Sequence, residues 1–130
     1  MTSWTEVINY VRVRHEVLEE TGDWLRFRLA TAGERTQQVS VHHLPDLDGK
    51  AWVEISSPVG RAAEIDLQRL LELCGAPEIG GAAVVDGLAL LKHLAPLEDM
   101  DIREEFERPL ALLVARADAI EHELTSGDDF

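Results

Sequence analysis

The fold is decided by the stretch KAWVEISSPVG, which spans residues 50–60. Side chains alternate across a strand, so Val53 and Ile55 share one face, and this face is apolar. The opposite face carries Trp52, Glu54 and Ser56. One apolar and one mixed face are typical of an antiparallel strand that covers a core. The pattern predicts a strand from Trp52 to Ser56, and we expect Pro58 to end it because proline has no backbone N–H to donate.

Two alternating segments precede this strand. Residues 24–31 and 36–44 each place apolar side chains at every second position, which predicts two half-buried strands. The glycines at Gly33 and Gly49 lie in the short segments between the strands, where a turn is needed. Three consecutive strands joined by short turns make an antiparallel meander.

A second hairpin is expected further along the chain. Asp86-Gly87 separates two short apolar runs, and this dipeptide favours a tight turn. We therefore predict a fourth strand from Gly80-Gly81 to Val85 and a fifth from Leu88 to Leu94.

Three segments have the apolar spacing of helices. The first runs from Ser3 to Glu20 and begins with the capping-box pattern Ser3-x-x-Glu6. The second contains Ile65 to Cys74, and the third runs from about Asp101 to Leu124. Pro109 lies inside the third pattern, so we expect a kink or a break between Glu105 and Pro109.

These elements predict one α+β domain over residues 1–130. A single antiparallel five-stranded sheet is flanked by three helices, in the order α-β-β-β-α-β-β-α. Residues 126–130 are expected to form a frayed acidic tail.

The charge of the chain narrows the choice of partners. Twelve basic and 25 acidic residues give a net charge of −13, and 11 of the acidic residues follow position 97. Such a surface repels phosphate groups, so we expect no nucleic-acid partner. Cys74 is the single cysteine, and neither a signal peptide nor a membrane-spanning run is visible. We expect a cytoplasmic protein without a membrane partner.

The sequence contains no recognisable set of catalytic or metal-binding residues. His42 and His43 are adjacent on a strand and point to opposite faces, so they cannot share one metal ion. Asp46-x-Asp48-Gly49 matches only part of a calcium loop, because the remaining ligand positions are missing. We therefore expect no metal, no cofactor and no enzymatic activity.

The element order and three short motifs carry a resemblance. The motifs are the run from Trp52 to Val59, the hairpin at Asp86-Gly87, and Ala117-Asp118 with the trailing Glu121 and Leu124. Together they resemble the YbjN-like family, whose fold is that of the type III secretion chaperones. The resemblance implies a non-enzymatic, chaperone-like or regulatory domain that binds a partner polypeptide as a homodimer.

Two functional hypotheses follow. In the first, a partner peptide binds an exposed sheet face that carries Trp24, Trp52 and parts of the second strand, namely Val39 and Val41, or binds an apolar dimer seam. The alternative for Trp24 and Trp52 is that both pack beneath a helix or a dimer partner.

The second hypothesis is a small-molecule-binding or enzymatic domain. Its pocket would lie between the sheet and the last helix, and its candidate residues are His42, His43, Glu54 and His93.

Overall fold

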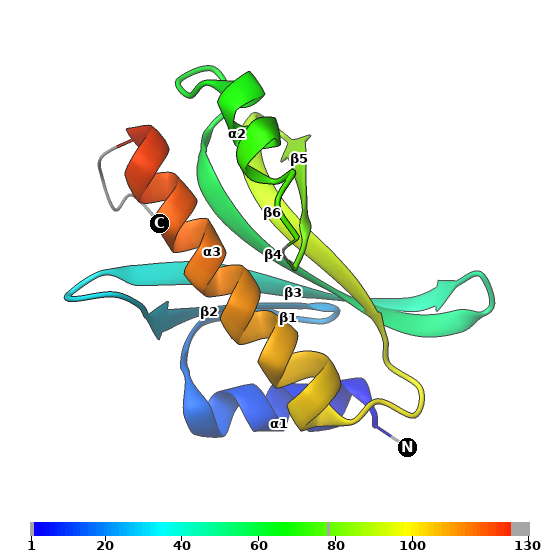
Figure 1. The fold of residues 1–130 in the computed structure, drawn as a ribbon. Helices are drawn as coiled ribbons and strands as arrows, with labels where there is room; N and C mark the ends of the chain where they lie inside the picture. The colour runs from blue at the N-terminus through cyan, green and yellow to red at the C-terminus, as the bar shows by residue number, and fades with distance from the viewer. Residues whose placement is uncertain (1, 78, 126–130) are drawn as a thin grey trace.

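An antiparallel sheet of six strands forms the centre of the molecule (Figure 1). This computed structural model describes residues 2–77 and 79–125, and the tail expected at 126–130 lies outside them. The spatial order is β1-β2-β3-β4-β6-β5. The strands are β1 (Glu16–Thr21), β2 (Trp24–Ala30), β3 (Thr36–Leu47), β4 (Lys50–Arg61), β5 (Gly81–Val85) and β6 (Leu88–Pro96). The α+β class and the antiparallel sheet are confirmed, but the sheet has one more strand than the sequence predicted.

The central strand β4 is longer than predicted. Val53 and Ile55 are fully buried, as expected. The prediction that Pro58 ends the strand is wrong, because β4 continues to Arg61 and the pairing with β6 shifts register between Pro58 and Gly60. This irregularity accommodates a residue without a backbone N–H. The carbonyl of Pro58 accepts a hydrogen bond from Nε2 of Gln37 at 2.6 Å.

The additional strand, β1, takes the place of the C-terminal end of the predicted first helix. Helix α1 (Trp4–Arg14) is capped by Ser3 as expected, but its C-cap His15 has extended backbone and residues 16–21 pair with β2. Two ion pairs cross from β1 to β2, Glu16 with Arg28 at 3.7 Å and Glu19 with Arg26 at 3.1 Å. Pairing with β2 therefore overrides the helical spacing of this segment.

Both Asp-Gly turns occur where the sequence predicted them. Asp48 and Gly49 have φ of 56° and 78°, and Asp86 and Gly87 have φ of 50° and 80°. Positive φ at both central residues suits the twist of a two-residue hairpin. The first turn joins β3 to β4, and the second joins β5 to β6.

The long C-terminal helix changes geometry instead of breaking. Residues Ile102–Glu107 form a π-helical turn, η1, and helix α3 (Arg108–Thr125) follows directly. The backbone N–H of Arg108 bonds to the carbonyl of Arg103, five residues back. The irregularity thus lies where Pro109 was expected to cause one.

The helices cover one face of the sheet. Helix α3 crosses β3, β4 and β6 (Figure 1). Helix α1 meets the preceding turn η1 through an edge-to-face contact between Tyr10 and Phe106, whose ring centroids are 6.2 Å apart. Short helix α2 (Leu67–Leu73) packs mainly against α3. The buried sheet residues include Leu25, Phe27, Val39, Val41, Val53, Ile55, Ala89 and Leu91.

No described helix covers the opposite face of the sheet, which we call the open face. It carries Trp24, Arg26, Arg28, Gln38, Ser40, His42, Trp52, Glu54, Ser56, Lys92 and Leu94. Within residues 2–77 and 79–125, no helix combines the length and the apolar character needed to cross a bilayer.

Candidate protein-binding surfaces

The two strand tryptophans lie on the open face. Trp24 stacks on His42, its cross-strand neighbour, with ring centroids 4.0 Å apart and planes 9° apart. Although it stacks on His42, Trp24 remains 46% exposed to solvent. Trp52 is half-buried, and its indole N–H donates to the carbonyl of Leu47 at 2.9 Å. Neither ring is buried beneath a helix, so both remain within reach of a partner.

The two valines expected to join them face the other way. Val39 and Val41 are 0% exposed and belong to the core beneath α3. Trp24, Trp52, Val39 and Val41 therefore do not form one surface. Alternation within β3 explains the difference, because odd-numbered positions of this strand face the helices and even-numbered positions face away.

The charges of the open face are largely paired. Lys92 contacts Glu54 at 3.2 Å, while Arg26 and Arg28 reach carboxylates of β1. The excess of acidic residues in the chain is therefore not concentrated on the open face. A partner that approaches this face would meet a nearly neutral surface.

The residues of the enzymatic hypothesis are divided between the two faces. His42 and Glu54 are cross-strand neighbours on the open face. His43 lies on the helix side, stacked on Trp4 at 5.2 Å and with Nδ1 3.0 Å from the Asp23 carboxylate.

His93 lies on the helix side as well, beside Ile55, and burial lowers the pKa of its imidazole. The four candidates of the enzymatic hypothesis therefore do not converge on one point. Among the described residues, no three His, Cys, Asp or Glu side chains gather as metal ligands would.

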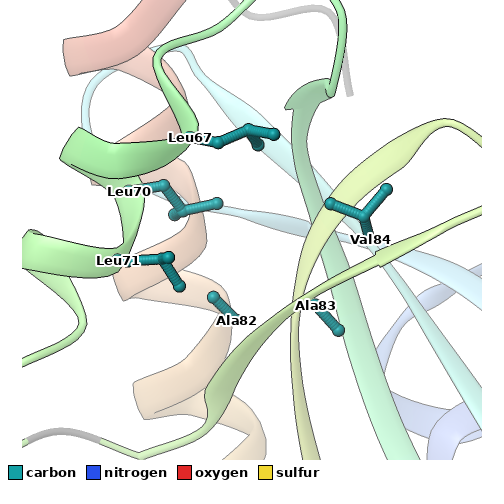
Figure 2. Close-up of a pocket in the computed structure, with 6 residues that line it drawn as sticks. All are labelled: Leu67, Leu70, Leu71, Ala82, Ala83 and Val84. Atoms are coloured by element: carbon teal, nitrogen blue, oxygen red, sulfur yellow. The ribbon is translucent and has the colours of Figure 1, made fainter.

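A cavity opens between α2 and β5, away from the predicted pocket under α3. It has a volume of about 250 Å³ and is lined by Leu67, Leu70, Leu71, Ala82, Ala83 and Val84. Figure 2 shows the leucines of α2 on one side and the small side chains of β5 on the other. We call this cavity the α2–β5 groove. Its lining contains no polar side chain, so it suits apolar groups and offers no catalytic chemistry.

Helix α2 is held on its α3 side and leaves the groove side free. Asp66 caps the helix by accepting from the backbone N–H of Arg69 at 3.0 Å, and Leu70 is buried. Nη2 of Arg116 in α3 donates to the carbonyl of Leu73 at 3.2 Å, and Arg69 pairs with Glu123 at 3.4 Å. These contacts anchor α2 to α3.

The groove residues are unusually exposed for apolar side chains. Leu71 is 62% exposed, Val84 52% and Leu67 37%. This surface was not predicted, although Leu67 and Leu71 are one helical turn apart and form a second apolar stripe beside Leu70 that the sequence makes visible.

Comparison of the chain with models of protein families, with curated proteins and with solved structures finds no match.

Proposed function

We propose that this protein is a non-enzymatic module that binds a partner polypeptide, in the manner of a chaperone or a regulatory adaptor. The α2–β5 groove carries the proposal, because its lining is wholly apolar and three of its side chains remain substantially exposed to water. Contiguous exposed apolar surface of this kind marks interaction sites on soluble proteins. The likeness to YbjN-like proteins that we infer from the sequence motifs implies the same kind of function, and the observed order of elements differs from the expected one by strand β1.

Capture of a partner from the native cell tests this function. Tagged protein is compared with its Leu71→Glu and Val84→Glu variants, which place a charge in the groove. We expect both variants to lose the partner that the unchanged protein retains. Leu112→Glu is the matched control, because Leu112 is 52% exposed on α3 and does not line the groove.

Two results would contradict the proposal. One is undiminished capture by both folded groove variants. The other is a metabolite or metal ion that raises the thermal midpoint of unfolding in a ligand screen, as a ligand of the folded state does. That outcome would favour the alternative, a small-molecule-binding or enzymatic domain.

We also propose that the protein is a homodimer and that the open face forms the interface. The exposed Trp24–His42 stack and the paired charges of this face support self-association despite the net charge of −13. Sedimentation of the Trp24→Ala, Trp52→Ala double variant tests this. We expect it to sediment as a monomer, and a folded variant that remains dimeric would rule out the open face.

A further inference from the structure

The two edge strands of the sheet, β1 and β5, differ in how well they are protected against pairing with another strand. Edge strand β1 carries Glu16, Glu19 and Glu20, and its pairing is irregular between Val17 and Glu19. Charged side chains and bulges are the devices by which natural sheets keep other strands from adding to an edge. The β1 edge is therefore protected.

Edge strand β5 has none of these devices. Its sequence is Gly-Ala-Ala-Val-Val, without charge or proline, and it pairs with β6 in unbroken register from Gly81 to Val85. A regular, uncharged edge can accept another strand. Of the two sheet edges in the described part of the chain, the unprotected one is thus the β5 edge, which borders the α2–β5 groove.

The hairpin geometry shows which backbone groups are available. The two-residue turn closes at the pair Val85 and Leu88, and hydrogen-bonded pairs recur at every second residue of an antiparallel ladder. The N–H and C=O groups of Ala82 and Val84 consequently point away from β6. The side chains of the same two residues line the groove (Figure 2).

The charge around the groove selects the kind of partner. Asp66 directly precedes Leu67, and Asp86 directly follows β5, and neither forms an ion pair with a described residue. The nearby cations Arg61 and Arg69 are already paired with Glu64 and Glu72. A second copy would bring the same two aspartates against Asp66 and Asp86, whereas a basic segment would neutralise their negative charges.

We propose that the partner adds to β5 as an extended strand of another polypeptide. Its backbone bonds to Ala82 and Val84, its alternate apolar side chains enter the α2–β5 groove, and flanking lysine or arginine residues meet Asp66 and Asp86. This inference rests on the proposed function and specifies how that function is carried out. It is a case of peptide recognition by strand addition, in which backbone bonds supply affinity and side-chain pockets supply specificity.

A synthetic peptide of about eight residues, with valine and threonine alternating between lysine ends, is a suitable probe because every second side chain faces the groove. We expect amide hydrogen exchange at Ala82 and Val84 to slow when the peptide is added, while Ala83 and Val85 are already protected. Replacing the lysines by glutamates should weaken binding several-fold at low salt.

Two N-methylated peptides separate strand addition from simple apolar contact. Each is methylated at one alternate set of backbone nitrogens, so only one of them loses the N–H groups that face β5. We expect that peptide to bind at least about tenfold more weakly, and the other to bind like the parent.

Several outcomes would overturn the inference. The first three concern the peptides: both methylated peptides bind with equal affinity, the parent peptide does not bind, or the glutamate-flanked peptide binds as tightly as the lysine-flanked one. The fourth is a dimer of the protein that Val84→Lys dissociates and Leu112→Lys does not. The last result would assign the edge to a second copy of the chain. Loss of the native partner by Leu71→Glu would still uphold the proposed function in each of these cases.

Discussion

Asp118 shows how single residues attach the last helix to the sheet. Its side chain is buried in α3, and its Oδ2 accepts from Nε of Arg35 at 3.0 Å. Arg35 lies in the turn between β2 and β3 and is itself half-buried. A buried carboxylate is stable only where a cation or hydrogen-bond donors compensate for its lost hydration.

Arg35→Met should therefore destabilise the protein. It leaves the buried Asp118 carboxylate without its guanidinium, and we expect a loss of about 2 kcal/mol in the free energy of unfolding. Urea titration measures this, and Asp118→Leu in the same chain should restore part of the loss. Arg26→Met is the control, since its exposed pair with Glu19 should contribute less than about 1 kcal/mol. Equal stability of both single variants would contradict the expected role of Arg35.

His93 makes stability depend on pH in a predictable direction. Burial lowers the pKa of His93 below 6.5, so near that pH the unfolded chain binds more protons than the folded one. The contribution of His93 is complete above its unfolded pKa and is lost as the pH falls through the folded pKa. We expect the urea midpoint to drop between pH 7.5 and pH 5.5, values that bracket roughly the ordinary histidine range. The drop should be smaller in His93→Gln, and an identical pH profile would contradict this origin.

Among the elements, those with strong alternation could be predicted from sequence. The strands β2 and β3 follow directly from period-two patterns. Both Asp-Gly turns follow from turn chemistry, and strand β6 was predicted only because one of these turns separates two apolar runs. Strand β1 could not be predicted, because Val11 and Leu18 also fit helical spacing and only the pairing with β2 decides between the two. The extension of β4 past Pro58 was hidden for a similar reason, since the register shift that tolerates the proline depends on β6.

Gly60 is the position where β4 requires glycine. A Cβ at this position would lie 2.8 Å from Cγ2 of Ile65, so Gly60→Ala forces Ile65 to shift. We expect a loss of about 1–3 kcal/mol in the free energy of unfolding, measured by urea titration. Ile65→Ala in the same chain should recover part of it by removing the clashing atom. Gly81→Ala is the control, because nothing lies within 4 Å of its Cβ position, and an equal loss there would contradict the steric explanation.

For the whole molecule, charge is the dominant global property. With a net charge of −13, the negative side chains lie closer together in the folded state than in the unfolded chain, so their mutual repulsion destabilises the folded state. Raising NaCl from about 0.1 M to about 1 M shortens the screening length from about 10 Å to about 3 Å, so we expect the urea midpoint to rise. The double variant Glu34→Gln, Glu98→Gln removes two exposed negative charges, so its urea midpoint should rise less with salt. A midpoint that falls with salt would show that ion pairs outweigh repulsion.

The candidate site was less predictable than the fold. Alternation fixes the face of a side chain, so Trp24 and Trp52 could be placed opposite the aliphatic side of the sheet, but whether a helix covers them could not be predicted. The α2–β5 groove depends instead on the distance that α3 imposes between α2 and the sheet edge. That spacing arises from contacts between residues more than forty positions apart, such as Leu73 and Arg116, and no local pattern encodes it.

The position of β4 has a consequence for biosynthesis. It joins β3 on one side to β6 on the other, so it is the seam between the N-terminal strands and the later hairpin. A chain emerging from the ribosome displays β4 as an unpaired strand edge until residues 88–96 have been translated. Val53 and Ile55 stay uncovered for longer, until helix α3 follows. The maturing polypeptide is therefore most vulnerable to association with its neighbours during this interval, and the arrival of β6 brings it to an end.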